Sequence, residues 1–382
     1  MEGKISDIDY INEVKDNVLS VNQKELSRLY EELKSADCII TYGSGRSLCS
    51  ATIGTSQMAK MKKNPKIVVS PEDPGFPGSG MLDAAPELEK RYEKILLFVN
   101  SGGGTSEDPK EVCAELGRYI EETNSEKFSM GLITSKPNSP IAQIVRRHGR
   151  VMRLSGRKKR EVRNEYRKTG IMGDIFELSS LSLIHMMAEA LHENGSADLV
   201  FELLGEEFPK IGEAVDDIVG ANEYDAAINI LERRNDVFLG GRGTSDEVAK
   251  MTAIRLTHVK SPLGDNVYRA RGVNTPHPRA GDFQILISYS GETESVLRWC
   301  QDFRRDSGIV FSITANEGSR LDKTSNYRII LEEEVEPGRP RRFYMRTAFV
   351  LSPLPVKLIE RLEERGLLLP EYVLHFYHST IE

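Results

Sequence analysis

The sequence predicts an α/β protein made of two doubly wound parallel-sheet lobes, flavodoxin-like or Rossmann-like, that are related by internal duplication. Short continuous apolar runs alternate with segments whose apolar residues recur at helical spacing, which is the pattern of buried parallel strands joined by helices. This succession occurs twice along the chain. The length of 382 residues also exceeds what one hydrophobic core usually supports, so two lobes are expected.

The first half opens with amphipathic helix, because residues 11–34 carry apolar side chains at helical spacing. Short apolar runs then predict four strands, with helix-like segments between them. The predicted strands are residues 38–42, 67–69, 95–99 and 130–134.

The same succession starts again after Ala197, where helical stretches extend through Arg234. Five further apolar runs predict strands at residues 237–241, 266–268, 283–288, 309–313 and 327–330. We therefore expect a first lobe of residues 1–196, which includes the N-terminal helix, and a second lobe of residues 197–382.

Three pairs of motifs match between the halves and occur in the same order. They are GSGRS at 43–47 with GRGTS at 241–245, NSGGGT at 100–105 with SYSGET at 288–293, and MGDIFE at 172–177 with MRTAFV at 345–350. A duplication is the simplest explanation of this order.

Charge and composition exclude several classes of partner. The net charge of −7 argues against nucleic acid or an anionic membrane as a partner, since both require a basic surface. Residues 1–16 lack the apolar core of a signal peptide, and we expect no apolar stretch near the roughly 18 residues that span a bilayer. A cytoplasmic location is therefore expected. The four cysteines are scattered without metal-ligand spacing, so we predict reduced thiols and no metal site.

The loop 288–293 lies where a buried strand meets a helix. Its hydroxyls, backbone N–H groups and glycine would surround a helix N-terminus, which favours an anion such as phosphate. Simple helix capping by Ser290 or Thr293 remains an equal alternative at this point. Dinucleotide binding is disfavoured, because the third glycine position of the fingerprint holds Leu48 in one lobe and Asp246 in the other.

Several segments resemble the SIS (sugar isomerase) domain of 6-phospho-3-hexuloisomerases. In the second lobe they are GRGTSDEVAKMTAIRLTH at 241–258, VNTP at 273–276 and GDFQILISYSGET at 281–293. In the first lobe, MGDIFE at 172–177 is similar to the M-G-T-x-F-E segment that begins the family's C-terminal helix and carries its catalytic glutamate.

This resemblance implies a tandem SIS protein in which Glu177 is the acid/base and His258 lies at the site. It also implies that phosphate is bound by Ser245, Ser288, Ser290 and Thr293, with Gly243 and Gly291 shaping the loops. No cofactor is implied.

Neither lobe has the full set of family residues. Val350 stands at the glutamate position of the second lobe, Lys60 at the histidine position of the first, and Gly102 at the second serine of the first-lobe loop. We therefore expect one competent site, made of the second lobe's phosphate loop and Glu177. The first-lobe loop, with Ser47, Ser101 and Thr105, would be a weakened or repurposed anion site.

The expected activity is isomerisation of a hexose phosphate. Its most specific form is the conversion of hexulose 6-phosphate to fructose 6-phosphate. Moving a carbonyl through an enediol(ate) requires a group that carries a proton between two carbons, and a carboxylate can do this. A histidine is suited to transferring protons between the two oxygens. The alternatives are other hexose or amino-sugar phosphates, and a non-catalytic sugar-phosphate sensor. Glu177 could also be a surface helix residue, and His258 a core histidine. A monomeric pseudo-dimer and a homodimer both remain open.

One basic segment, residues 146–168, precedes the Glu177 motif. A solvated loop and helix face is the favoured interpretation, and a clamp for an anionic substrate or nucleic acid is the alternative.

Overall fold

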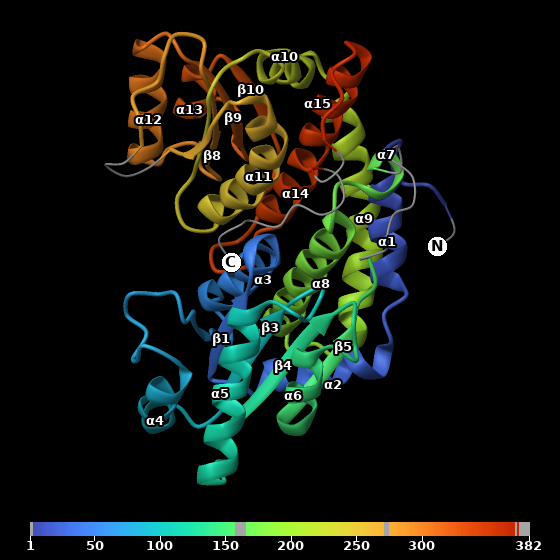
Figure 1. Ribbon diagram of the computed structural model, residues 1–382, viewed down its shortest axis with the longest axis vertical. Helices are drawn as coiled ribbons and strands as arrows, with labels where there is room; N and C mark the ends of the chain where they lie inside the picture. Colours follow the sequence, from blue (N-terminus) through green and yellow to red (C-terminus); the bar gives the residue numbers. More distant parts are fainter. Residues whose placement is uncertain (1–2, 157–165, 271–274, 371–372, 374–382) are drawn as a thin grey trace.

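Two parallel five-stranded sheets form the framework of the protein (Figure 1). The structure is a computed structural model that describes residues 3–156, 166–270, 275–370 and 373. The first sheet has the order β2-β1-β3-β4-β5. Its strands are β1 (Cys38–Gly43), β2 (Ile67–Val69), β3 (Ile95–Asn100), β4 (Phe128–Thr134) and β5 (Gly149–Arg153).

The second sheet has the order β10-β9-β8-β6-β7. Its strands are β6 (Val237–Gly240), β7 (Val267–Arg269), β8 (Phe283–Ile287), β9 (Ile309–Thr314) and β10 (Tyr327–Ile330). In both sheets the second strand in sequence lies at the edge beside the first, followed by the third, fourth and fifth. The predicted duplicated, doubly wound α/β fold is thus confirmed, as are the nine predicted strands.

Strand β5 was not predicted. It lies at the edge of the first sheet, pairs only with β4, and carries arginines at both ends of a short apolar pair. An edge strand needs no continuous apolar run, so its sequence pattern is weak. The expectation of a loop and helix face is therefore wrong for Arg150 and Arg153, which lie on this strand. Part of the same basic segment, residues 157–165, lies outside the described residues.

Helices cover both faces of each sheet (Figure 1). In the first half they are α1 (Asp9–Leu19), α2 (Gln23–Ser35), α3 (Gly45–Lys60), α4 (Met81–Arg91), α5 (Glu107–Thr123), α6 (Pro140–His148), α7 (Tyr166–Thr169) and α8 (Asp174–His192). In the second they are α9 (Ala197–Val219), α10 (Asn222–Leu231), α11 (Thr244–Lys260), α12 (Glu294–Arg305), α13 (Arg320–Thr324), α14 (Phe343–Leu351) and α15 (Pro353–Glu364). The proposed lobe boundary at residue 196 falls in the turn between α8 and α9.

The N-terminal helical region is divided into α1 and α2. Asn22 starts α2 by accepting hydrogen bonds from the backbone N–H groups of Lys24 and Glu25 at 3.0 and 3.1 Å. An asparagine at this position satisfies donors that the first helical turn leaves unpaired, so it favours a new helix over a continuous one.

Helix α8 is the central helix of the protein, and every residue in it is buried. The stretch Tyr166–His192 is long and apolar enough to cross a membrane by length and composition, which corrects the expectation that no stretch approaches this limit. However, 94% of its most apolar window is buried inside the protein, where α8 packs against α1, α3 and α9. Burial against other helices explains its composition as that of a core helix.

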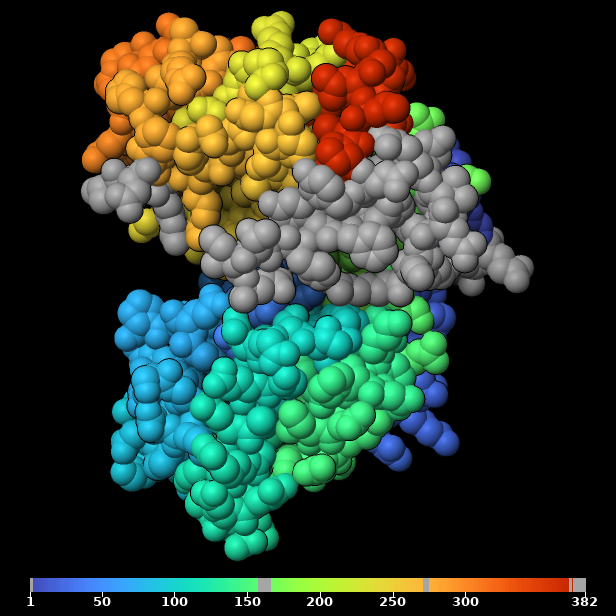
Figure 2. Space-filling view, in the orientation of Figure 1, coloured from blue at the N-terminus to red at the C-terminus, as the bar shows by residue number. Residues whose placement is uncertain are grey.

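The two lobes meet along a helix interface, and one hydrophobic core continues through both. Helix α3 of the first lobe packs against α11 of the second. In the space-filling view the first sheet and its helices, blue to green, form the lower body, and the second sheet, yellow to red, forms the upper body (Figure 2).

A network of buried ion pairs connects helices across this interface. Arg342, just before α14, donates to Glu189 of α8 at 2.6 Å and to Glu207 of α9 at 2.8 Å. Arg346 donates to Glu207 at 2.6 Å. Both carboxylate side chains are almost completely buried, so their charges depend on these arginines.

Replacing Glu207 by alanine should lower the free energy of unfolding by about 3 kcal/mol, because it leaves two partly buried guanidinium groups without their shared partner. Urea unfolding followed by circular dichroism measures this change. The control is Asp225→Ala, which removes one of the partners of Arg361 at a carboxylate that is 57% exposed and should cost no more than about 1 kcal/mol. Equal losses in the two variants would contradict the structural role of Glu207.

Candidate functional site

A cavity of about 530 Å³ opens where the strands of the first sheet end and α11 of the second lobe begins to cover them. It is lined by residues 43–47, 101–103 and 105–108 from two loops and the helix starts that follow them, together with Glu72, Met172, Gly173, Glu177, Ile254, Arg255 and His258. Side chains from both lobes therefore meet in one hollow.

Glycines shape the two loops, which connect β1 to α3 and β3 to α5. At Gly43 an added Cβ atom would lie 2.6 Å from the carbonyl oxygen of Asn100, so the two strand ends approach too closely for a side chain. Gly104 has a φ of +63°, and a Cβ there would lie 2.0 Å from Ser139 Oγ. Asn100 donates to the carbonyl of Ser47 at 2.9 Å and fixes one loop against the other. As a result, both helix N-termini face the cavity.

Several hydroxyl groups in these loops have no hydrogen-bond partner among the described residues. Within the described part of the chain, no residue hydrogen-bonds the side-chain oxygens of Ser47, Thr105 or Ser106. Ser106 occupies the N-cap of α5 but makes no side-chain capping bond. Ser101 Oγ accepts from Gly104 N at 3.2 Å and keeps its own hydrogen to donate. These groups can donate to the oxygens of an anion at the two helix N-termini.

The structure corrects the register in which the two loops were matched. Gly104 and Gly291 both have positive φ, and a Cβ on either would collide with a serine, Ser139 or Ser319, about 2 Å away. Gly291 N donates to Ser288 Oγ at 3.2 Å, which is the bond that Gly104 N makes to Ser101 Oγ.

Ser101 therefore corresponds to Ser288, one residue later than the motif match suggested. Gly103, rather than Gly102, stands at the position of Ser290, and Ser106 stands at the position of Thr293. The motif match went wrong because its first residue, Asn100, is polar like serine but belongs to the end of β3.

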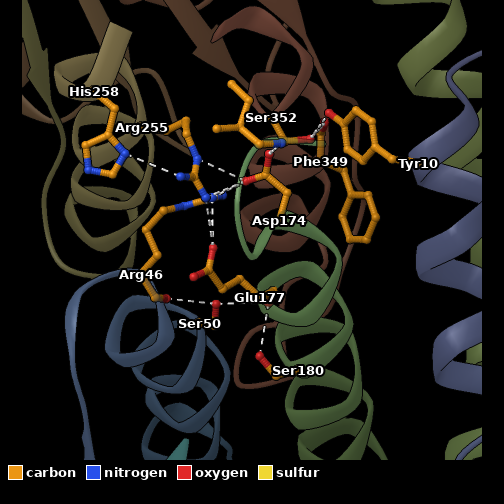
Figure 3. Close-up of polar contacts among 11 residues, drawn as sticks. Tyr10, Arg46, Ser50, Asp174, Glu177, Ser180, Arg255, His258, Phe349 and Ser352 are labelled. Atoms are coloured by element: carbon orange, nitrogen blue, oxygen red, sulfur yellow. Dashed lines mark hydrogen bonds and ion pairs between the residues drawn. The ribbon is translucent and has the colours of Figure 1, made fainter. Parts of the chain in front are cut away.

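A buried cluster of charged side chains forms the back of the cavity (Figure 3). Glu177 Oε2 lies 2.8 Å from Arg46 Nη1 and 3.4 Å from Arg255 Nη2. Asp174 Oδ1 pairs with the same two arginines, at 2.8 Å from Arg255 Nη2 and in a short contact with Arg46. The four side chains are at most 6% exposed, and their two positive and two negative charges compensate one another.

The arginines also set the protonation of their neighbours. Burial raises the pKa of Asp174, but Arg255 and Arg46 lower it more, so the carboxyl stays ionised with a pKa below its ordinary value. Burial, Arg255 and Arg46 together lower the pKa of His258 to about 3. His258 is therefore neutral near pH 7.

The hydrogen bond from Arg255 defines the tautomer of His258. Arg255 Nη1 lies 3.3 Å from His258 Nδ1. A guanidinium group can only donate, so Nδ1 must accept, and the hydrogen of the neutral ring is on Nε2. The cavity thus contains a carboxylate, Glu177, and an imidazole that donates through Nε2, brought together from α8 and α11.

The structure groups the predicted site residues differently from the expected arrangement. Glu177 and His258 share the cavity with Ser47, Ser101 and Thr105, which all belong to the first-lobe loops. The second-lobe residues do not line this cavity: Ser245, Ser288, Ser290, Thr293, Gly243 and Gly291 lie at the strand ends of the second sheet. The physical reason is that α8, which carries Glu177, starts beside the strand ends of its own sheet.

Sequence reasoning missed Arg46, Arg255, Asp174 and Ser106. Arg46 lies inside the GSGRS motif, and Arg255 lies one helical turn before His258, which was the available signal. Asp174 stands where the family segment has threonine. In the described ranges, no group of three or more His, Cys, Asp or Glu side chains is arranged to hold a metal ion.

Comparisons with known proteins locate the similarity mainly in the second half. Residues 230–350 match the SIS domain family and form a SIS domain. An uncharacterized protein of Methanothermobacter thermautotrophicus is 32% identical over 132 residues, or 35% of this chain and 64% of that protein. A 3-hexulose-6-phosphate isomerase of Bacillus subtilis is 29% identical over 123 residues, or 32% of this chain and 62% of that protein. The chain thus spans less than two thirds of the length of these relatives.

The fold of the whole chain is shared with a solved structure, the tagatose-6-phosphate ketose/aldose isomerase from Escherichia coli. The TM-score is 0.57 at 14% sequence identity, and the match covers 98% of this chain and 94% of that one. At this identity the similarity shows the two-sheet fold alone.

His258 should make stability depend on pH. Its folded pKa of about 3 is below its ordinary value of 6.5, so the unfolded chain binds a proton between these values that the folded chain does not. This part of the stability is present above about pH 6.5 and is lost as the pH falls. Relative to a His258→Asn variant, wild type should lose about 2 kcal/mol more between about pH 7 and pH 4.5.

Urea unfolding at a series of pH values measures this difference. Asparagine keeps an acceptor for Arg255, so the variant tests the titration rather than the hydrogen bond. His277→Asn, at an exposed histidine on the second lobe, controls for replacing an imidazole by an amide. Parallel pH profiles for wild type and His258→Asn would contradict a neutral, buried His258.

Proposed function

We propose that this protein isomerises a hexose phosphate in the cavity between the lobes, moving the carbonyl through an enediol(ate). The observation that carries the proposal is the meeting of Glu177 and neutral His258 in a cavity whose other wall is a glycine- and hydroxyl-rich pair of loops. The name of the Bacillus subtilis relative and the SIS domain at 230–350 support the same substrate class.

The loops would hold the phosphate end of the substrate. Ser47, Thr105 and Ser106 have hydroxyls available, and the N-termini of α3 and α5 add backbone N–H donors and the positive ends of their dipoles. This assignment uses the first-lobe loop rather than the second-lobe loop, because only the first shares a cavity with Glu177.

Glu177 would carry the proton between the two carbons. Its carboxylate takes a proton from the carbon next to the carbonyl and returns it to the neighbouring carbon, so the double bond and the oxygen charge pass through an enediolate. Arg46 and Arg255 hold Oε2 in place at 2.8 and 3.4 Å. Their positive charges also stabilise the negative charge that develops on the substrate oxygens.

His258 would serve the substrate oxygens. Nε2–H of the neutral ring can donate to the carbonyl oxygen as it becomes an alkoxide, and the ring can then take the proton of the adjacent hydroxyl. Because Arg255 binds Nδ1, the exchange is confined to Nε2. Hexulose 6-phosphate and fructose 6-phosphate are the proposed pair, in keeping with the name of the Bacillus subtilis relative.

The same ion pairs favour a second candidate, a non-catalytic sugar-phosphate sensor. Glu177 is already engaged by two guanidinium groups and its side chain is 6% exposed. A carboxylate held in this way has less freedom to accept a proton from carbon. Binding without turnover would then be the function of the cavity.

Incubation with fructose 6-phosphate in deuterated water separates the two candidates. The isomerase should incorporate deuterium next to the carbonyl, as followed by mass spectrometry and NMR. Glu177→Gln should slow exchange by about 10²- to 10⁴-fold, because it removes the group that accepts the carbon-bound proton. Glu93→Gln, at an exposed glutamate away from the cavity, is the matched control and should exchange at the wild-type rate.

Two results would contradict the proposal. Exchange at the wild-type rate in Glu177→Gln would exclude Glu177 as the base. Absence of exchange in wild type, with fructose 6-phosphate still raising the melting temperature, would favour the sensor.

A further inference from the structure

Asp174 is a buried carboxylate to which the proposed reaction assigns no role. It is the first residue of α8, its exposed fraction is 1%, and the residues that line the cavity do not include it. The family segment M-G-T-x-F-E has threonine at this position, so the carboxylate is a feature of this chain rather than of the motif. A buried charge is unfavourable unless it is well paired, so its partners indicate what it does.

Both oxygens of Asp174 are engaged. Oδ2 accepts from the backbone N–H of Ile171 at 2.5 Å, which closes the turn before α8. Oδ1 accepts from Arg255 Nε at 3.1 Å and from Arg255 Nη2 at 2.8 Å, and it also accepts from Arg46 Nη1. The carboxylate is therefore held by its own turn, by α3 and by α11, and it gives Arg255 a fixed acceptor.

The guanidinium group of Arg255 connects Asp174 to His258 (Figure 3). Nε and Nη2 lie along one edge of this planar group, and both donate to Asp174 Oδ1. Two hydrogen bonds from one edge fix the orientation of the plane as well as its position. The remaining nitrogen, Nη1, then lies 3.3 Å from His258 Nδ1. The contact with Asp174 thus determines whether Nη1 reaches the imidazole.

Glu177 competes with Asp174 for Arg255. Arg255 Nη2 lies 3.4 Å from Glu177 Oε2 but 2.8 Å from Asp174 Oδ1, so Asp174 is the closer acceptor. Without the charge of Asp174, Glu177 would be the one carboxylate among the described residues left to pair with both Arg46 and Arg255. Arg255 would then turn toward Glu177, and Nη1 would move away from His258.

The tautomer of His258 depends on the bond from Nη1. While Nη1 donates, Nδ1 can only accept, so the neutral ring carries its hydrogen on Nε2. Without this donor either nitrogen can carry the hydrogen, and a ring with the hydrogen on Nδ1 presents an acceptor at Nε2. The proposed step requires a donor at Nε2 for the carbonyl oxygen of the substrate, so the Nδ1–H form is unproductive.

We propose that Asp174 is a positioning residue for the isomerisation: it orients the guanidinium group of Arg255, which in turn keeps the hydrogen of His258 on Nε2. Asp174 acts through Arg255 and does not contact the reacting atoms. The consequence for the rate rests on the proposed function. The effect on the imidazole is a property of the free protein and can be measured without substrate.

Nitrogen-15 NMR of the histidine rings tests the positioning. The shifts of the two ring nitrogens distinguish the Nε2–H form from the Nδ1–H form. Burial, Arg255 and Arg46 lower the pKa of His258 to about 3, so the wild-type ring is neutral at pH 7. Wild type should show only the Nε2–H form of His258, and Asp174→Asn, which removes the charge and keeps the size, should populate the Nδ1–H form. A His258→Asn sample identifies the His258 signals by their absence.

Two further variants separate orientation from charge and from folding. Arg46→Lys keeps a cation beside Asp174 at a residue with no printed contact to His258, so the wild-type tautomer should remain. Should circular dichroism show that Asp174→Asn does not fold, the double variant Asp174→Asn Arg46→Gln removes one buried charge of each sign and leaves the cluster neutral. It should populate the Nδ1–H form as well.

Deuterium exchange into fructose 6-phosphate measures the consequence for the rate. Asp174→Asn should lower kcat by about 10- to 100-fold and change KM by less than about threefold, because Asp174 acts on the group that donates a proton and not on the bound substrate. Asp302→Asn is the matched control, at a carboxylate of α12 that is 48% exposed and pairs with Arg305. It should keep the wild-type kcat and KM.

The NMR and kinetic measurements distinguish this inference from the proposed function. Absence of exchange in wild type, together with the Nδ1–H form in Asp174→Asn, would count against the reaction and support the positioning. An unchanged Nε2–H form in folded Asp174→Asn, or in the double variant where that is the folded one, would overturn the inference. A lower kcat with the wild-type tautomer would also overturn it, because Asp174 would then serve the structure alone.

Discussion

The compensation of two buried carboxylates by two buried arginines determines how this protein is assembled. Asp174 and Glu177 lie at the start of a helix with no exposed residue, where an unpaired charge would cost several kcal/mol. Arg46 comes from the first lobe and Arg255 from the second, so full compensation exists only when the lobes are docked. The packing of α3 against α11 and the continuous core through both lobes are therefore requirements of the site as well as of the fold.

The contribution of α11 to the cavity follows from the same constraint. The first lobe contains the loops, both carboxylates and Arg46, but it lacks Arg255 and His258, which come from α11 of the second lobe. The cavity lies at the switch point of the first sheet, beside the ends of β1 and β3, where a doubly wound lobe places a ligand site, and α11 of the second lobe completes its wall. Because the chain contains two copies of the lobe, it has both the cavity of the first lobe and the helix of the second lobe that completes the wall of this cavity.

The sequence was sufficient to predict the fold and two of the residues that line the cavity. Buried parallel strands carry continuous apolar runs, so their positions could be predicted, while edge strand β5 carries arginines and could not. Glu177 and His258 were predicted from motifs, and the structure places both in the wall of one cavity. Arg46 and Arg255 were missed because their partners are far away in sequence, at Asp174 and Glu177, and only the folded chain brings them together. The loop that shares the cavity with Glu177 was misjudged for the same reason.

The charged residues that distinguish the two lobes differ as a group rather than one at a time. Gly45 and Gly243 have positive φ at the starts of α3 and α11, which aligns these helices and places neutral Thr244 and Gln57 opposite Arg46 and Arg255. The motif match places neutral Thr347 opposite Asp174. Introducing a buried carboxylate alone would leave a charge unpaired, and introducing an arginine alone would do the same, so neither step is favourable without the other. The charge of each site is thus an all-or-none property of the cluster. This coupling accounts for one lobe having a compensated cluster of charges while the matched positions of the other lobe are uncharged.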